Sequence, residues 1–188
     1  MSAPAKIATQ SGLKRTVVLV GLMGAGKSSV GKRLAENLGL RFVDSDAEIE
    51  LAAGMSIPEI FATYGETYFR DGERRVLARL LNEPPCILAT GGGAFMNAEN
   101  RRLIREKAIS VWIKADLETL WNRVQGKPGR PLLAQANAKQ VLADLLAKRY
   151  PVYGEADIVI ESTKENPHME VVEAIKQALV EKNFLEIE

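Results

Sequence analysis

Residues 21–28 of the chain read Gly-Leu-Met-Gly-Ala-Gly-Lys-Ser and match the phosphate-binding pattern G-x-x-x-x-G-K-[ST]. Glycines at these positions let successive backbone N–H groups turn toward an anion, and a helix that starts here adds the positive end of its dipole. Lys27 is then expected to reach the β- and γ-phosphates of a nucleotide, and the Ser28 hydroxyl to ligate Mg²⁺. The alternative is a glycine-rich turn that matches the pattern by chance.

The sequence on both sides of this loop favours phosphate binding. Residues 16–20, Thr-Val-Val-Leu-Val, form a short β-branched run that predicts a buried strand. Val30, Leu34 and Leu38 recur at every fourth position after the loop and predict an amphipathic helix. A phosphate-binding loop requires a strand before it and a helix after it, so the chain is expected to bind a nucleoside triphosphate.

Four further apolar runs predict strands, at residues 41–43, 86–89, 109–113 and 157–160. Helical sequence separates each run from the next. Short, continuously apolar strands that alternate with helices are typical of a parallel sheet covered on both faces. The expected fold is therefore a single α/β domain with three layers and a doubly wound, five-stranded parallel sheet, for which 188 residues suffice.

Composition narrows the expected partners and compartment. The 25 basic and 24 acidic residues nearly cancel, so no field of one sign favours nucleic acid or an anionic membrane surface. Cys86 is the single cysteine, which excludes an intramolecular disulfide and fits a reducing cytoplasm. The basic and apolar residues 14–26 could pass for a signal peptide, but Lys27 interrupts them well short of the ~20 residues that span a bilayer. Residues 1–14 lack periodicity and are expected to form a flexible tail.

One turn-rich loop lies in the second half of the chain. Residues 125–131 read Gln-Gly-Lys-Pro-Gly-Arg-Pro and carry two cations, Lys127 and Arg130. One interpretation is a simple connection between helices. The other is a lid that closes over a bound nucleotide, for which cations on a movable loop are suited. We favour the lid and expect it to extend over about residues 123–136.

The residues that follow the predicted strands are candidates for ligand contacts, because parallel α/β sheets bind ligands at the carboxyl ends of their strands. Asp44 and Asp46 follow the second strand, where strand spacing would point both the same way. One is suited to hold Mg²⁺ through water and the other to accept a hydrogen bond from an attacking hydroxyl. The alternative is a turn with a helix-capping aspartate. Residues 91–93, three consecutive glycines, follow the third strand and offer bare backbone N–H groups.

A charged pair in helical sequence is a further candidate. Arg70 and Glu73 are three residues apart and so share a helix face. Such pairs are commonly exposed, but Phe69 anchors this segment, and an arginine held by a carboxylate is preorganised to bind an anionic substrate through two contacts. Arg149, near the end of a helix predicted over residues 132–150, is a second candidate for the same anion. His168, in the first turn of the last helix, is interpreted as a solvated helix end rather than a ligand.

Taken in order, these segments resemble the shikimate kinase family. The resemblance covers about residues 12–180 and implies a fold of the P-loop nucleoside-monophosphate-kinase type. Apart from the phosphate-binding loop each motif is weak alone, whereas the ordered set is highly specific. Besides that loop, the set comprises Asp44-Ser45-Asp46 followed by Ile49-Glu50, Phe69-Arg70 with Glu73, Gly91-Gly92-Gly93, Gly129-Arg130-Pro131-Leu132-Leu133 and Arg149-Tyr150-Pro151-Val152-Tyr153.

The resemblance implies transfer of the γ-phosphate of ATP to the 3-hydroxyl of shikimate, with Mg²⁺ as cofactor, in the route to chorismate and the aromatic amino acids. Lys27, Asp46 and Arg130 would be the catalytic residues, with Asp46 binding the reacting hydroxyl and serving as base. Arg70 and Arg149 would clamp the shikimate carboxylate.

The remaining roles are likewise implied by the resemblance. Glu73 would orient Arg70. Gly92, which lies between Gly91 and Gly93 at the substrate site, would contact a ring hydroxyl. Asp44 would support Mg²⁺ through water, and Ser28 would also hold this ion. The expected ATP contacts are Gly24, Ala25, Gly26, Lys27, Ser28, Ser29, Arg123, Arg130 and Pro167. Among these, Arg130 would descend from the lid onto the phosphates, Arg123 would lie near the adenine, and Pro167 would close over the base.

Two other functions remain open at this point. A gluconate kinase of the same build is the nearest rival, although Phe69-Arg70 together with residues 91–93 argues against it. A GTP-dependent switch or a nucleotide sensor is the rival from another class, but the sequence has no guanine-reading Asn-Lys-x-Asp motif. The expected protein is a cytoplasmic monomer that acts on shikimate and ATP.

Overall fold

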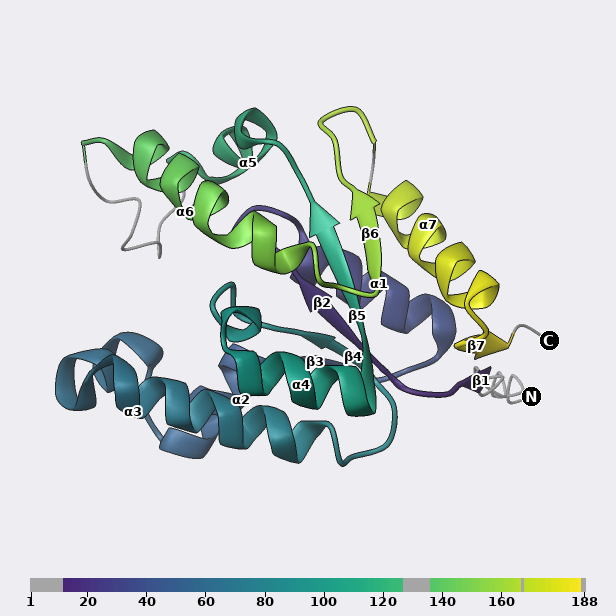
Figure 1. The fold of residues 1–188 in the computed structure, drawn as a ribbon, viewed down its shortest axis with the longest axis horizontal. Coiled ribbons are helices and arrows are strands. Elements are labelled where there is room, and N and C mark those ends of the chain that lie inside the picture. Colours follow the sequence, from purple (N-terminus) through teal and green to yellow (C-terminus); the bar gives the residue numbers. More distant parts are fainter. Residues whose placement is uncertain (1–11, 127–135, 167, 187–188) are drawn as a thin grey trace, which may run out of the picture.

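A computed structural model describes residues 12–126, 136–166 and 168–186 of the chain (Figure 1). At its centre is a parallel five-stranded sheet with the order β3-β4-β2-β5-β6. The central strand β2 has all five residues buried, because helices cover both of its faces. The strands of this sheet are β2 (Thr16–Val20), β3 (Phe42–Asp44), β4 (Ile87–Ala89), β5 (Ala108–Lys114) and β6 (Ile158–Glu161).

Helices form the two outer layers. Helices α1 and α7 pack against each other on one face of the sheet, while α4 packs on β5 from the other face, with α3 beside it (Figure 1). Right-handed crossovers between parallel strands produce this double winding. The helices are α1 (Lys27–Leu38), α2 (Ser45–Ala53), α3 (Ile57–Leu80), α4 (Ala98–Lys107), α5 (Leu117–Val124), α6 (Ala138–Tyr153) and α7 (His168–Glu181), with a 3₁₀ turn, η1 (Ala94–Met96), before α4.

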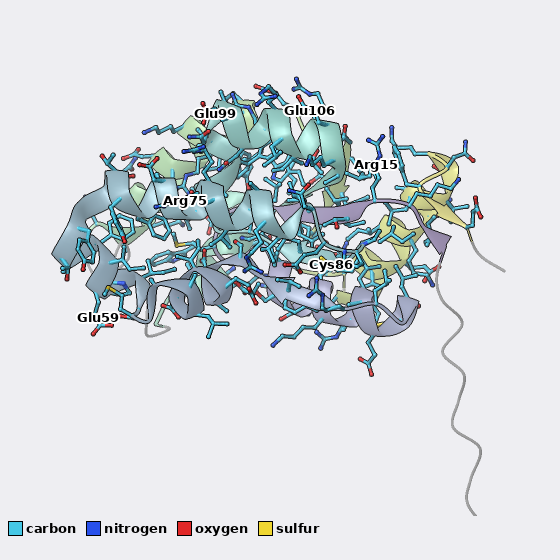
Figure 2. All side chains as sticks on the ribbon, turned by 90° about the horizontal axis from the view of Figure 1, so that it is seen from below. Arg15, Glu59, Arg75, Cys86, Glu99 and Glu106 are labelled. Carbon is cyan, nitrogen blue, oxygen red and sulfur yellow. The ribbon has the colours of Figure 1, made fainter. Side chains whose placement is uncertain are left out.

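The helices follow the amphipathic pattern of the sequence. Arg75 on α3 and Glu99 and Glu106 on α4 point outward into solvent (Figure 2), whereas the apolar side chains of these helices enter the core. Helix α3 begins with a capping box, in which Ser56 and Glu59 satisfy each other's backbone N–H groups. It is kinked at Gly65, where φ is 81°, so its first two turns take a different direction from the rest.

The predicted α/β fold and all five predicted strands of the main sheet are confirmed. Most of the strands have a boundary that differs from the prediction by one residue. Two boundary predictions are wrong. Helix α6 begins at Ala138 rather than at Leu132. The predicted tail of residues 1–14 is too long, because Gly12–Leu13 form strand β1, which pairs antiparallel with β7 (Leu185–Glu186).

The error in the tail has a simple cause. The two-residue pairing of β1 with β7 is made by main-chain groups and carries no alternation of apolar side chains that a sequence could reveal. Residues 1–11 lie outside the described part of the chain, as does most of the predicted lid, at 127–135. Among the described residues, no helix combines the length and the apolar character needed to cross a membrane.

Candidate active site

The loop between β2 and α1 has the backbone that its glycines predict. Gly24 and Gly26 have φ values of 83° and 97°, in a region that residues with side chains rarely adopt. Gly26 is also the N-cap of α1. A Cβ atom on Gly24 would lie 2.6 Å from Cγ1 of Val124 in α5. The phosphate-binding loop is thus closely packed and turns its backbone toward the N-terminus of α1.

Two side chains of α1 carry the polar groups of this loop. Lys27 Nζ donates to the carbonyl oxygens of Gly21, at 2.7 Å, and Leu22, at 3.0 Å, so its ammonium group is held over the loop. Ser28 Oγ donates to a carboxylate oxygen of Asp44 at 3.4 Å. The residues expected to bind phosphate and Mg²⁺ therefore lie together, although Lys27 and Ser28 belong to α1 and Asp44 belongs to β3.

The two aspartates are arranged differently from the prediction of strand spacing. Asp44 ends β3 and acts as the N-cap of α2, accepting a hydrogen bond from the N–H of Asp46 at 3.0 Å. The helix begins at Ser45, so Asp46 lies in its first turn and not on a strand. The capping alternative is correct for Asp44, since the orphan N–H groups of a helix start need an acceptor. Capping and a place in the cleft prove compatible, because α2 starts at the carboxyl edge of the sheet.

Asp46 is a half-buried carboxylate with spare bonding capacity. Its Oδ1 atom is buried and has no hydrogen-bond partner within the described residues. Burial raises the pKa of Asp46, and the charge of Asp44 raises it further, while Lys27 and Arg70 act in the opposite direction. A carboxylate of this kind is a stronger proton acceptor than an ordinary surface aspartate.

The pairing of Arg70 with Glu73 on one face of α3 is confirmed. Arg70 Nη1 donates to Glu73 Oε2 at 2.9 Å, and the Glu73 side chain is only 3% exposed. Burial raises the pKa of Glu73, whereas the hydrogen bond from Arg70 lowers it. The more exposed Glu66 contacts Arg70 Nε at 3.5 Å. Glu73 thereby fixes one end of the Arg70 guanidinium, while Arg70 still lines the cleft.

Each of the three consecutive glycines, here called the triglycine segment (91–93), faces a different functional side chain. A Cβ on Gly91 would lie 2.7 Å from Oδ1 of Asp46, and one on Gly93 would lie 2.6 Å from both terminal nitrogens of Arg70. A Cβ on Gly92 would lie 2.7 Å from Nη1 of Arg149. The sequence predicted glycines that expose N–H groups to a ligand, and the structure adds a second reason. Side chains at these positions would displace the charged groups from the site.

Groups from the phosphate-binding loop, α2, α3, α6 and the triglycine segment open onto one large cavity, so the common cleft implied by the predicted site is present. Its volume is about 1620 Å³. The predicted residues that line it are Gly24, Gly26, Lys27, Ser28, Ser29, Asp46, Arg70, Gly92, Arg123 and Arg149. Of the predicted residues that the structure describes, five do not line this cavity: Ala25, Asp44, Glu73, Gly91 and Gly93. Lys27 and Arg70 thus open onto the same space, although they come from helices on different sides of the sheet.

Arg123 connects two walls of the cavity. Its guanidinium donates to the carbonyl of Gly24 at 3.2 Å, to Ser162 Oγ at 3.1 Å and to the carbonyl of Thr163 at 2.9 Å. It therefore ties the phosphate-binding loop to the segment between β6 and α7. Arg130 and Pro167, the other two residues expected beyond the loop at the nucleotide, lie outside the described residues.

His168 lies in the first turn of α7, as predicted, but nothing in the sequence indicated that its half-buried side chain lines the cavity beside Gly26. Burial and the charges of Arg33 and Arg123 lower its pKa. Sequence reasoning also missed the apolar wall of the cavity. This wall is formed by Ile57, Pro58, Phe61 and Ala62 before the kink in α3, and by Leu145 of α6. The exposure of Phe61 carried no signal in the sequence, since only the kink brings that turn over the cleft.

The glycine-rich loop connects the central strand β2 to α1, and the parallel sheet has the order β3-β4-β2-β5-β6. Together these features define a P-loop kinase of the nucleoside-monophosphate-kinase type. The family model for shikimate kinase matches residues 23–180. The chain belongs to the shikimate kinase family, and the predicted fold, enzyme class and shikimate-phosphorylating activity are confirmed.

Individual relatives support this assignment. The shikimate kinase of Caulobacter vibrioides is 62% identical over 165 residues, which cover 88% of this chain and 82% of that protein. The structure of shikimate kinase from Acinetobacter baumannii in complex with shikimate is 40% identical with a TM-score of 0.84, covering 89% of this chain and 94% of that one. A gluconokinase from Sinorhizobium meliloti, 18% identical over 90% of this chain and 93% of its own, has a TM-score of 0.62 and shares the fold alone.

Proposed function

We propose that the chain transfers the γ-phosphate of ATP to the 3-hydroxyl of shikimate within this cleft, as a step toward chorismate and the aromatic amino acids. The observation that supports this most is the meeting of two chemically different walls in one cavity. One wall presents the phosphate-binding loop with Lys27. The other presents a half-buried carboxylate, Asp46, and two arginines suited to a carboxylate-bearing substrate, Arg70 and Arg149.

On the substrate side, we assign Asp46 as the base that binds the reacting hydroxyl. Its buried Oδ1 and its raised pKa fit a group that accepts a proton from an alcohol. Arg70 and Arg149 bind the shikimate carboxylate, and Glu73 orients Arg70 through their 2.9 Å hydrogen bond. The triglycine segment contributes backbone N–H groups, with Gly92 at a ring hydroxyl.

On the nucleotide side, we assign the phosphates of ATP to the backbone of residues 24–26, with Lys27, Ser28 and Ser29 adding side-chain contacts. Arg123 supports the adenine site by holding the loop against residues 162–163. Arg130, carried by a lid over about residues 123–136, and Pro167 complete the nucleotide site in this proposal.

Magnesium fits the polar pair next to the loop. Ser28 Oγ and Asp44 Oδ2 are 3.4 Å apart, and hydroxyl and carboxylate oxygens are the ligands that Mg²⁺ prefers. We assign Ser28 as a direct ligand and Asp44 as a ligand through water. The ion would neutralise charge on the phosphates during transfer.

The residues of the cleft then act mainly by alignment. Phosphoryl transfer passes through a loose transition state, so most of the catalysis comes from placing the two substrates in line and neutralising charge. Arg70 and Arg149 fix the position of the acceptor, Asp46 receives the proton of its hydroxyl, and Lys27 offsets negative charge on the γ-phosphate. Such an enzyme needs no second copy of the chain, and we propose a cytoplasmic monomer.

The test is ADP release by the purified protein with ATP and Mg²⁺, measured with and without shikimate. We expect release to depend on shikimate. Gluconate and nucleoside monophosphates serve as alternative acceptors, and activity confined to either of them would refute the shikimate assignment. Release that no acceptor stimulates would favour a nucleotide sensor.

A further inference from the structure

A cluster of aromatic side chains, Phe95, Trp112 and Tyr153, packs next to the triglycine segment and connects it to helix α6. Tyr153, the last residue of α6, is fully buried. Its ring centroid lies 5.9 Å from that of Trp112 on β5 and 6.4 Å from that of Phe95 in η1. Its hydroxyl donates a hydrogen bond to the carbonyl of Gly92. A phenylalanine ring would fill the same space, so packing alone gives no reason for the hydroxyl.

The same phenol lies beside a substrate-binding arginine. The position of a Cβ on Gly92 is 2.7 Å from Nη1 of Arg149 and 3.6 Å from the hydroxyl oxygen of Tyr153. Arg149 and Tyr153 are four residues apart and so lie on one face of α6. The phenol, the Gly92 peptide and the guanidinium therefore meet at one point on the wall of the cleft.

We propose that Tyr153 is a positioning residue for shikimate, acting through Gly92 and Arg149. The inference rests on the proposed function of the cleft and goes beyond it, since Tyr153 does not line the cavity itself. A peptide unit is planar, so a Gly92 carbonyl held by the buried phenol directs the N–H of Gly93 away from Tyr153. One hydrogen bond thus fixes the orientation of the triglycine backbone next to Arg149.

The phenol is suited to this task because it stays protonated. Burial raises the pKa of Tyr153, while the nearby charge of Arg149 acts in the opposite direction. At neutral pH the hydroxyl is therefore a hydrogen-bond donor, and the Gly92 carbonyl is its acceptor. Without that donor the carbonyl would lose this partner, and the peptide would rotate toward another one.

Tyr150 offers a matched control from the same cluster. It lies in the same helix, its ring contacts Trp112 at 4.8 Å, and its hydroxyl also donates to a backbone carbonyl, that of Ala115. Burial raises the pKa of Tyr150 to about 12. Neither Tyr150 nor Ala115 lines the cavity. The two tyrosines thus both contact Trp112 and both donate to a backbone carbonyl, but Tyr150 is half-buried and holds a carbonyl outside the cavity.

The experiment compares Tyr153→Phe with Tyr150→Phe in the full chain. For Tyr153→Phe we expect the KM for shikimate to rise roughly 3- to 10-fold, the equivalent of one neutral hydrogen bond. The KM for ATP should stay unchanged, and kcat should change less than the KM for shikimate. For Tyr150→Phe both KM values should stay unchanged. Melting temperatures of both variants report any loss of stability.

A double-mutant cycle tests the route of the effect. If Tyr153 acts through Arg149, the Tyr153→Phe effect on the shikimate KM should shrink in an Arg149→Lys background. An unchanged shikimate KM in Tyr153→Phe, with melting temperatures lowered alike in both tyrosine variants, would leave Tyr153 a packing residue and overturn the proposal. A wild-type protein that does not turn over shikimate would instead overturn the proposed function.

Discussion

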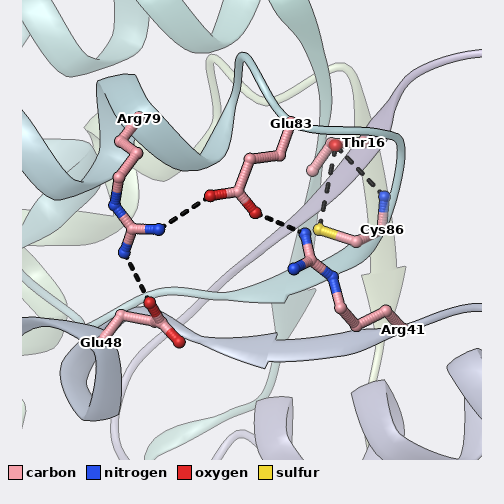
Figure 3. Close-up of polar contacts among 6 residues, drawn as sticks. All are labelled: Thr16, Arg41, Glu48, Arg79, Glu83 and Cys86. Carbon is pink, nitrogen blue, oxygen red and sulfur yellow. Dashed lines mark hydrogen bonds and ion pairs between the residues drawn. The ribbon is translucent and has the colours of Figure 1, made fainter. Parts of the chain in front are cut away.

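Near the amino ends of β2, β3 and β4, polar side chains form two sets of paired contacts, whereas two carboxylates at the cleft, on α2 and α3, each leave a buried oxygen without a partner among the described residues. The amino-edge network (Thr16, Arg41, Glu48, Arg79, Glu83 and Cys86) is shown in Figure 3. Glu83 accepts from Arg41 and from Arg79, each at 2.7 Å, so both its oxygens are occupied. The Thr16 hydroxyl accepts from the backbone N–H of Cys86 at 3.2 Å.

The carboxyl edge differs in its electrostatics. The hydrogen bond from Arg41 lowers the pKa of Glu83, as expected for a paired carboxylate near solvent. Burial instead raises the pKa of Asp46 and of Glu73, and each has one buried oxygen without a partner among the described residues. Both edges are rich in charge, so charge density alone does not mark a site. Buried carboxylate oxygens without partners beside a cleft favour a functional site, because leaving such groups unpaired costs free energy.

The largest effect is expected from Asp46→Asn. If Asp46 is the base, kcat should fall by ~10²- to 10⁴-fold, the usual contribution of general acid–base catalysis. Nucleotide binding should be retained, because Asp46 is not assigned to ATP. Steady-state ADP release with saturating shikimate measures the first effect, and nucleotide titration the second. A variant with wild-type turnover would remove Asp46 from the mechanism.

Arg70→Ala should act on affinity rather than on turnover. It removes a substrate-binding guanidinium and leaves the buried Glu73 without its partner. We expect shikimate binding to weaken by about 2 to 5 kcal/mol, the range for truncating one member of a buried charge pair. Calorimetric titration with shikimate measures the change, and ATP affinity serves as the internal control. Equal losses for both substrates would point to misfolding of α3 instead.

A smaller effect is expected from a single methyl group in the triglycine segment. In Gly93→Ala, the added Cβ would lie 2.6 Å from the terminal nitrogens of Arg70, so the guanidinium must move and the KM for shikimate should rise. Gly72→Ala is the matched control, because a Cβ there meets nothing within 4 Å in the same helix as Arg70. That control should keep its kinetics and gain up to about 1 kcal/mol of stability from helix propensity. Unchanged kinetics in Gly93→Ala would contradict the packing argument.

The smallest expected effects concern stability and its dependence on pH. A carboxyl whose pKa is raised by folding stabilises the protein below its ordinary pKa and loses that contribution as pH rises. Asp46→Asn should therefore raise the melting temperature at pH 7, by roughly 2–4 °C for each kcal/mol of relieved destabilisation. The gain should shrink as pH falls toward the ordinary aspartate value of 3.8.

The amino edge should show the opposite sign. Folding lowers the pKa of Glu83, so its contribution is present above the ordinary glutamate value and is lost in acid. Glu83→Gln should slightly lower the melting temperature at pH 7, and the difference should vanish as pH falls. Catalysis should be unaffected. Melting curves of both variants between pH 7 and pH 4 test whether the two edges differ as described.

Local patterns in the sequence were sufficient for much of the site. Residues 21–28 predicted the phosphate-binding loop because its glycines, lysine and serine are consecutive and act together. The spacing of Arg70 and Glu73 predicted their pairing because a helix brings residues three apart onto one face. Asp46 was found for a partly wrong reason, since it lies in the first turn of a helix and not at strand spacing.

The parallel sheet, the phosphate-binding loop and the family could be predicted from the sequence, because each is encoded in short runs of neighbouring residues. The folded chain was needed to show that the triglycine segment makes room for Asp46, Arg149 and Arg70, and that Tyr153 donates a hydrogen bond to it. These contacts join residues up to 61 positions apart. No local pattern encodes them, because they arise where separate strands end at one edge of the folded sheet.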